Sequence, residues 1–443
     1  MASVDTVPQS LLYALASEIS IAARDLTLFI RDTNAAALQD NQAGSHDIPS
    51  NAHADISRTK AALIEKTMAV QQLIMSATDV QQQMTLQTQQ MAAVRWICRF
   101  KVADYVPGAG SMSYNDLAIA ASVPEDQLTR ICRMAMTAGF FREPVSGEIG
   151  HTHTSVDLKS SCAVHDTFKF MTETGHSVVS KLPEMTEATV KANQEGKADK
   201  SITAFNIAMN TSMPFFKYIM SNPELAKQQA AHMRSVGAAE ESHVRHVLGG
   251  YDWGSLRSGA KVIDVGGSTG HCCVALAKEF PSLRFVVQDL PPVLSQAKIP
   301  DDLKDRVELQ AHDFMTPQPA ASKGAEVFFI RQCLQNWSHT DATRILQNIL
   351  PAMDKDKSRI VIMSAILADA SDPSIGQREK GISRMRDLFM MMAMGGQERD
   401  SQQWEALVKD ADAQLEISSV NKPRGSVLSV IEVKFKPDSW APV

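Results

Sequence analysis

The pattern of apolar and polar residues divides the chain into a helical first half and a second half in which strands alternate with helices. Apolar residues recur at helical spacing over 11–32, 57–101 and parts of 166–247. The stretch 34–51 is rich in Asn, Asp, Gly and Ser, and it predicts a loop. After residue 251, short β-branched runs predict seven strands: 262–265, 285–288, 307–310, 327–330, 360–363, 415–419 and 428–433.

Strands that alternate with helices predict an α/β fold, in which helices cover both faces of a largely parallel sheet. Only the short stretch 421–425 separates the last two expected strands, so we expect them to form an antiparallel hairpin at one edge. Residues 115–142 have a helix–turn–helix pattern, and the short wing EPVSGEIGHT follows, which is typical of a winged helix. The second helix of this pattern offers only Arg130 and Arg133 as cations, so we interpret the module as a scaffold and not as a DNA reader.

A glycine-rich turn follows the first expected strand of the sheet. Gly266, Gly267 and Gly270 come directly after the apolar run 261–265, and a helical pattern begins at 271. Glycine lets backbone N–H groups approach a ligand that a side chain would block. The next strand ends in Asp289, about 20 residues on, where an acid can accept hydrogen bonds from ribose hydroxyls. This order predicts a nucleoside-containing cofactor, while GGSTG in place of GxGxxG weakens a dinucleotide interpretation.

Over 90–435 the chain resembles the plant-type S-adenosylmethionine-dependent O-methyltransferases, a family with many fungal members. The matching motifs are DVGGSTG, VVQDLPPVL, AHDFMTP, QNWS and GGQER, in that order and spacing. The resemblance implies a Rossmann-like class I methyltransferase domain, an N-terminal all-α dimerisation domain that contains a winged helix, and a homodimer. We expect a helical dimerisation region over 1–95, the winged helix over 96–160, helices that roof the substrate pocket over 161–248, and the cofactor domain over 249–443.

The resemblance also implies S-adenosyl-L-methionine as the cofactor. Gly266 and Asp289 match the family residues that hold the methionine and ribose ends of the cofactor. Asp313 and Phe314 match the pair that flanks adenine, and Arg331 matches a basic residue near the cofactor carboxylate. The full predicted set is Gly266, Gly267, Asp289, Leu290, Asp313, Phe314 and Arg331.

The residues that match the methyl-transfer machinery depart from the family pattern. Gln335 stands where the family has a catalytic histidine, and an amide has no useful basicity. Of two glutamates that brace this histidine in plant enzymes, one matches Glu398 and the other falls on Ser364. The loss of a general base typically lowers the rate by about 10²–10⁴-fold. His339 lies beyond the tryptophan, and we expect it at the surface in the first turn of the next helix.

Three functions fit a chain with intact cofactor motifs and no histidine base. We favour a pericyclase, an enzyme that cyclises or dehydrates a polyketide-derived pyridone by Diels–Alder, hetero-Diels–Alder or Alder-ene chemistry and uses the cofactor only as a cation. Such members occur in this family in fungal natural-product pathways, and the reaction needs shape and a hydrogen-bond donor. The alternatives are an O-methyltransferase that acts on an already acidic hydroxyl and a catalytically silent subunit that binds the cofactor.

The predicted catalytic residues are Gln335, His165, Ser364 and Glu398. His165, beside Asp166 in the first roofing helix, is the best histidine for orienting a substrate; His176 and His232 are weaker candidates. In the run FMMMAM over 389–394, five large residues in six cannot all face one way on a helix, so we assign most of them to the core. Histidines and cysteines show no metal-ligand spacing, and we expect no metal.

Composition narrows the partners and the compartment. The net charge is −6 and no stripe of Lys and Arg is present, which argues against nucleic-acid binding. The six cysteines are scattered without a CxxC pair, as suits a reducing cytosol. No run of 18 apolar residues occurs and the first 30 residues do not have the pattern of a signal peptide, so we expect a cytoplasmic protein without a membrane span.

Overall fold

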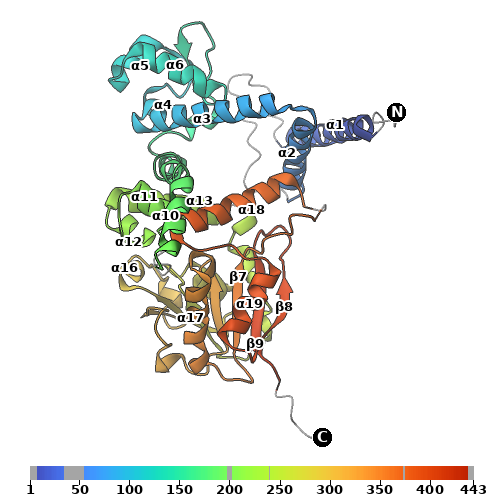
Figure 1. Ribbon diagram of the computed structural model, residues 1–443, viewed down its shortest axis with the longest axis vertical. Coiled ribbons are helices and arrows are strands. Elements are labelled where there is room, and N and C mark those ends of the chain that lie inside the picture. The colour runs from blue at the N-terminus through green and yellow to red at the C-terminus, as the bar shows by residue number, and fades with distance from the viewer. Residues whose placement is uncertain (1–6, 34–53, 197–201, 239, 373–374, 438–443) are drawn as a thin grey trace. The chain divides into compact units, whose positions relative to one another are not determined.

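The computed structural model describes residues 7–33, 54–196, 202–238, 240–372 and 375–437 (Figure 1). The loop predicted over 34–51 lies outside these residues. The chain forms two compact units. The first unit comprises 1–180, 216–235 and 373–381, and the second comprises 181–215, 236–372 and 382–443.

The first unit begins with three long helices, α1 (Val7–Thr33), α2 (Ala54–Ile74) and α3 (Ala77–Arg99). The helical pattern expected over 57–101 is interrupted, because a new helix begins after Ser76. The Ser76 hydroxyl accepts a hydrogen bond from the Asp79 N–H, and the Asp79 carboxylate accepts one from the Ser76 N–H, which together form a capping box. This local hydrogen bonding ends one helix and starts the next within an apolar pattern that continues across the break.

The winged-helix pattern is present in the first unit. Its helices are α5 (Tyr114–Ala121) and α6 (Glu125–Met136), and its wing is the antiparallel pair β1 (Met112–Ser113) and β2 (Glu148–Ile149). Ile97, Leu117, Leu128 and Ile149 are fully buried between these elements and α3. The remaining helices with residues in this unit are α4 (Val102–Tyr105), α7 (His153–Val156), α8 (Ala163–Lys169), the π-helix η2 (Phe170–Gly175), α9 (His176–Val179), α12 (Phe215–Met220) and α13 (Pro223–Ala238).

A seven-stranded sheet with the strand order β5-β4-β3-β6-β7-β9-β8 forms the centre of the second unit. The first five strands along the chain pair in parallel, whereas β9 pairs antiparallel with both β7 and β8. The expected parallel sheet and its antiparallel hairpin at one edge are therefore confirmed. The strands are β3 (Lys261–Val265), β4 (Arg284–Asp289), β5 (Val307–Ala311), β6 (Val327–Arg331), β7 (Arg359–Ser364), β8 (Leu415–Asn421) and β9 (Ser429–Phe435).

Alternate residues of the central strands pack into two separate apolar cores, one on each face of the sheet. Ile263 and Phe328 belong to the core that contains Trp404, whereas Val262 and Phe329 belong to the core that contains Trp253. This arrangement confirms a sheet that is covered on both faces. The helices of the second unit include α10 (Leu182–Gln194), α11 (Ala204–Ala208), α14 (Arg245–Leu248), α15 (His271–Glu279), α16 (Pro291–Leu294), α17 (His339–Ile349), α19 (Ser401–Ala411), and the end of α18 (Gln377–Phe389) with the π-helix η9 (Met390–Met394).

The parallel strands all point their carboxyl ends to one edge of the sheet, where ligands of open α/β sheets bind. Among the described helices, none combines the length and the apolar character that crossing a bilayer requires.

Candidate functional site

The glycine-rich turn after β3 has a backbone that only small residues tolerate. Gly266 and Gly270 have φ values of +73° and +80°, in the left-handed region that favours glycine. Gly267 is needed for space, because a Cβ atom there would lie 2.6 Å from Cγ of Asp264 and 3.0 Å from Cγ1 of Val287. A larger residue at Gly267 would therefore collide with side chains of the protein itself.

Hydrogen bonds join this turn to the end of β4. The N–H groups of Gly266 and Gly267 donate to the Gln288 carbonyl oxygen over 2.9 and 3.0 Å. The Asp289 carboxylate accepts from the backbone N–H groups of Ser268 and Leu290, each over 2.8 Å. Partial burial raises the pKa of this carboxyl. The predicted residues Gly266, Gly267, Asp289 and Leu290 therefore lie together at the carboxyl edge of the sheet.

Phe314 and Arg331 lie at the same edge. A Cβ atom on Gly266 would lie 3.4 Å from both Cε1 of Phe314 and Sγ of Cys333, so the three residues are neighbours. Arg331 ends β6 and donates from Nη2 to the Ser242 carbonyl oxygen over 2.5 Å. Its Nε is buried and has no hydrogen-bond partner among the described residues. Asp313 is adjacent to Phe314, and its side chain accepts from the Met315 N–H.

These features suit S-adenosylmethionine. Gly266 presents backbone without a side chain next to Phe314 and Cys333, and the unpartnered Arg331 donor suits a ligand carboxylate. The Asp289 carboxylate is held in a fixed position at the end of β4, as ribose recognition requires.

Asp264 is a residue of this edge that the sequence analysis did not single out. It is 2% exposed and accepts a hydrogen bond from Sγ of Cys273 over 3.3 Å. Burial raises the pKa of Asp264 to about 6. The sequence does contain a signal for a special role of Asp264, namely an acid inside the apolar run VIDV. A carboxyl in a buried central strand needs a specific partner.

Gln335 and Ser364 come into direct contact at the carboxyl ends of β6 and β7. Gln335 lies in the 3₁₀ turn η7 (Leu334–Asn336), and Ser364 ends β7; their exposed fractions are 8% and 1%. The Ser364 hydroxyl donates to Oε1 of Gln335 over 3.4 Å. Because this bond uses the amide oxygen, the amide Nε2 remains the donor that Gln335 can offer to a substrate oxygen.

The GGQER segment packs against the same turn. The Gln397 N–H donates to the Gln335 carbonyl oxygen over 2.9 Å, and a Cβ atom on Gly396 would collide with that oxygen. Glu398, the next residue, is 7% exposed, and its N–H donates to Oδ1 of Asp387 over 3.0 Å. Burial, helped by the neighbouring Asp387 charge, raises the pKa of Glu398 to about 7, although Arg386 and Arg399 oppose the shift.

Arg399 is a second residue that the sequence analysis missed. It is 0% exposed, and its guanidinium donates from Nη1 to the Leu334 carbonyl oxygen over 3.0 Å and from Nη2 to the Trp337 carbonyl oxygen over 3.3 Å. These bonds hold both ends of the turn that carries Gln335. The polar motif GGQER contains no sign that its arginine is buried, so the sequence offered no signal.

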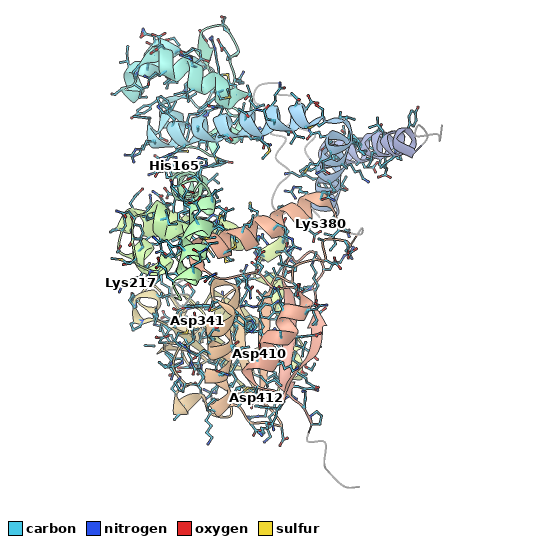
Figure 2. The ribbon with its side chains drawn as sticks, viewed as in Figure 1. His165, Lys217, Asp341, Lys380, Asp410 and Asp412 are labelled. Atoms are coloured by element: carbon cyan, nitrogen blue, oxygen red, sulfur yellow. The ribbon has the colours of Figure 1, made fainter. Side chains whose placement is uncertain are left out.

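His165 belongs to the first unit, and its observed contact is structural. It lies on α8 (labelled in Figure 2), is 2% exposed, and its Nδ1 donates to the Leu158 carbonyl oxygen over 2.7 Å. The neighbouring Asp166 pairs with Lys227 over 3.1 Å. Within the second unit the structure brings Gln335 and Ser364 into contact and packs the segment that carries Glu398 against the Gln335 turn, whereas His165 as a substrate-orienting residue stays a prediction.

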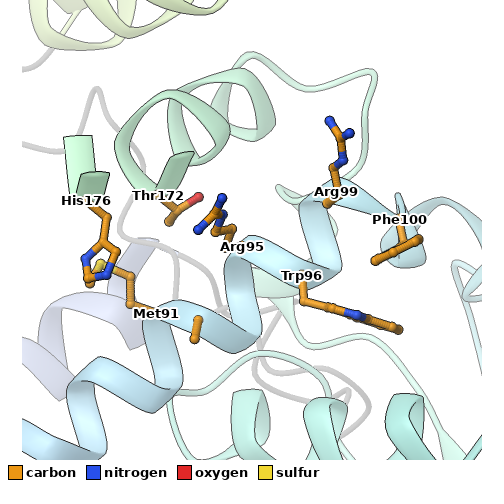
Figure 3. Close-up of a pocket in the computed structure, with 8 residues that line it drawn as sticks. Met91, Arg95, Trp96, Arg99, Phe100, Thr172 and His176 are labelled. Carbon is orange, nitrogen blue, oxygen red and sulfur yellow. The ribbon is translucent and has the colours of Figure 1, made fainter. Parts of the chain in front are cut away.

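His176, His232 and His339 have different surroundings, and the buried Nδ1 of His232 has no hydrogen-bond partner among the described residues. His232 stacks on Phe170 with ring centroids 5.5 Å apart. His176 lines a pocket of about 270 Å³ on α3, with Trp96 and Thr172 among its neighbours (Figure 3). His339 lies in the first turn of α17, as expected, and pairs with Asp410 over 2.9 Å (Asp410 is labelled in Figure 2).

Residues 390–394 of this run form the π-helix η9, Phe389 ends α18, and the side chains of the run face several ways. Met392 and Ala393 are buried, whereas Met391 is exposed. The five large residues do not share one face, as expected, but of these five only Met392 is buried, so the assignment of most of them to the core is wrong.

This arrangement is similar to that of several known proteins. A family model described as an O-methyltransferase domain matches residues 188–413. The O-methyltransferase VdtC of Byssochlamys spectabilis is 34% identical over 432 residues, which span 95% of this chain and 97% of that protein. In fold, the crystal structure of OxaC is similar with a TM-score of 0.71 at 21% identity, over 97% of this chain and 100% of that chain. A structure described as a pericyclic reaction enzyme has a TM-score of 0.67 at 23% identity, over 94% and 99% of the two chains.

The sequence relative is named an O-methyltransferase, whereas the likeness to the pericyclic enzyme is one of fold. The comparisons confirm the class I methyltransferase fold, which binds S-adenosylmethionine, and the expected family.

Proposed function

The chain belongs to the S-adenosylmethionine-dependent O-methyltransferase family, and we propose that it methylates an acidic hydroxyl of a small polyketide-derived metabolite in a fungal pathway. The observation that carries this proposal is the match to a named O-methyltransferase over nearly the whole length of both chains. It reverses the order of preference drawn from the sequence, where a pericyclase came first.

The residues at the carboxyl edge of the sheet would hold the cofactor. The turn at Gly266 and Gly267 would lie against it, Asp289 would accept from ribose hydroxyls, and Phe314 would pack on adenine. Arg331 would pair with the carboxylate, since its buried Nε has no partner among the described residues. S-adenosylmethionine supplies, when bound, an electrophilic methyl group on a sulfonium.

Gln335 explains why the hydroxyl should be acidic. Its amide cannot remove a proton, but Nε2 can donate to a substrate oxygen and fix its direction while Ser364 holds the other end of the amide. A phenol acidified by a neighbouring carbonyl gives up its proton more readily, so a base weaker than histidine suffices when the substrate is held in the correct position.

The pericyclase stays as a second candidate because the Gln335–Ser364 pair offers a buried donor without a basic side chain. A donor aimed at developing charge in a dry site stabilises a transition state by about 2.7–4 kcal/mol. That suffices to select one ring closure of a pyridone over another, with no proton removed.

We also infer a homodimer formed through the N-terminal helices and the winged helix. Exposed apolar residues on α1 and α3 support this assembly, because such surfaces often mark protein contacts. They include Leu11, Tyr13, Ile21, Leu28, Val80 and Met84.

One assay separates the candidates. The protein is incubated with methyl-labelled S-adenosylmethionine and a metabolite extract of the producing organism, and both labelled products and isomerised products are followed. We expect label in a product. Isomerisation that requires the cofactor but moves no label would replace the proposal by the pericyclase. Cofactor binding with neither outcome would indicate a silent subunit.

A further inference from the structure

We propose that Glu398 accepts the proton of the substrate hydroxyl as that hydroxyl is methylated, which is the role that a histidine has in the resembled family. This inference rests on the proposed methyl transfer and identifies the base for it. It assigns Glu398 a direct part in the reaction, although the family pattern implies only that a glutamate here braces another residue.

The Glu398 carboxyl is buried and incompletely satisfied. Its side chain is 7% exposed, and Oε2 has no hydrogen-bond partner among the described residues. Buried polar atoms in folded proteins almost always have a partner, so an exception needs a reason. A substrate hydroxyl that gives its proton to Oε2 would supply the missing partner.

Backbone contacts of the residues on either side place Glu398 next to the turn that carries Gln335 and next to the chain that follows Ser364. Gln397 donates to the Gln335 carbonyl oxygen over 2.9 Å. On the other side of Glu398, the Arg399 carbonyl oxygen accepts from the Leu367 N–H over 2.9 Å, so the segment pairs with the chain that follows Ser364. Glu398 therefore lies between a contact to the Gln335 turn and a contact to the chain after β7.

The charged surroundings suit a base at cellular pH. Burial raises the pKa of Glu398 to about 7, and Asp387 on α18 adds to the effect. Arg386 on α18 and the following Arg399 act in the opposite direction, while Gln335 and Ser364 carry no charge. Enzymes often raise a glutamate pKa to about 6–7 for general-base catalysis, because the base is then strong enough and still largely ionised.

The transfer breaks one O–H bond and one S–CH₃ bond and forms one O–CH₃ bond. The O–H bond of the substrate breaks, and its proton goes to Oε2 of Glu398. The electron pair left on the substrate oxygen forms the new O–CH₃ bond, and the former S–CH₃ pair stays on sulfur in the leaving thioether. Glu398 then releases the proton to water before the next turnover.

The test measures label transfer from methyl-labelled S-adenosylmethionine to the same metabolite extract, between pH 5.5 and 8.5. For the wild type we expect the rate to rise with pH through about 7 and then level off, because only the ionised carboxyl accepts a proton. Glu398→Gln, which has the same shape and no basicity, should lose about 10²–10⁴ in rate and lose this pH midpoint. Glu405→Gln, an exposed carboxylate on α19, is the matched control and should behave as the wild type.

Asp387→Asn distinguishes a chemical role from a structural one. It removes a negative charge that raises the pKa of Glu398, so the midpoint of the pH–rate profile should move to lower pH. Calorimetric titration with S-adenosylmethionine shows whether each variant is folded. If Glu398→Gln does not bind the cofactor, the change of the pH–rate midpoint in Asp387→Asn decides whether Glu398 is the base.

The outcomes are separable. Label in the wild type with an equal rate and pH profile in Glu398→Gln overturns the assignment and leaves the proposed function intact. A wild-type rate that falls as pH rises through 7 also overturns it, since Glu398 would then act as an acid. No label in the wild type removes the proposed function and, with it, the need for a base.

Discussion

The carboxyl edge of the sheet in the second unit has two parts that are built differently. We call the part after β3 and β4 the cofactor edge and the part after β6 and β7 the transfer edge. After β3 and β4 the site is mainly backbone, with positive φ values, a Cβ that cannot be accommodated at Gly267, and N–H groups donating to Gln288 and Asp289. After β6 and β7 it consists of side chains, namely Gln335, Ser364 and Glu398. A backbone site permits few residue types, whereas a side-chain site permits many. A family resemblance therefore predicts cofactor binding far better than the chemistry beside it.

The largest expected effect is on the transfer edge, where Arg399 holds the Gln335 turn. Arg399→Ala leaves the carbonyl oxygens of Leu334 and Trp337 without their donors in a buried site. Each unsatisfied group costs about 1–3 kcal/mol, and with the cavity we expect a loss of about 3–5 kcal/mol in the free energy of unfolding. Scanning calorimetry measures the change in Tm.

Arg344→Ala is the control, because that arginine side chain is 57% exposed and should change stability by no more than about 0.5 kcal/mol. If both variants lose the same stability, the guanidinium does not organise the turn. A stable Arg399→Ala protein with wild-type label transfer would contradict the side-chain description of this edge.

An intermediate effect is expected on the cofactor edge. Gly267→Ala places a Cβ 2.6 Å from Cγ of Asp264, so the backbone or the buried carboxyl must move. Overpacking of this kind destabilises by about 1–3 kcal/mol, and we expect at least a tenfold weaker affinity for S-adenosylmethionine in calorimetric titration.

Gly381→Ala is the matched glycine control. Gly381 lies within α18 on the exposed surface, and an added Cβ meets nothing within 4 Å. This substitution should stabilise the helix by about 0.5–1 kcal/mol and leave the affinity unchanged. Normal affinity in Gly267→Ala would show that the turn is not a close-contact surface for the cofactor.

The difference between backbone and side-chain sites also explains what could be predicted from the sequence. The sequence predicts every strand of the large sheet, because a short run of β-branched, apolar residues is typical of a buried strand. The interruption between α2 and α3 was not predicted, although Ser76 and Asp79 form a recognisable capping pattern. The reason is that the apolar spacing continues through it. Contact between Gln335 and Ser364 was foreseeable through the resemblance. The burial of Glu398 and Arg399 was not, because burial in a loop depends on the whole tertiary structure.

The smallest expected effect comes from restoring the missing histidine. Gln335→His places an imidazole where the family has its base, yet one of the two residues that would brace it is Ser364, whose hydroxyl does not stabilise an imidazolium as a carboxylate does. If Glu398 already accepts the proton, a second base adds little, and we expect label transfer at pH 7.5 to change by less than tenfold. Gln335→Ala, which removes the amide donor and adds no base, is the control and should transfer label more slowly than either protein. A gain of a hundredfold in Gln335→His would show that the transfer edge lacked only a base, and it would count against Glu398. With no such gain, and with weaker cofactor binding in Gly267→Ala, the two edges would differ in the changes that they tolerate. One added histidine would not restore the side-chain site, whereas one added methyl group would disrupt the backbone site.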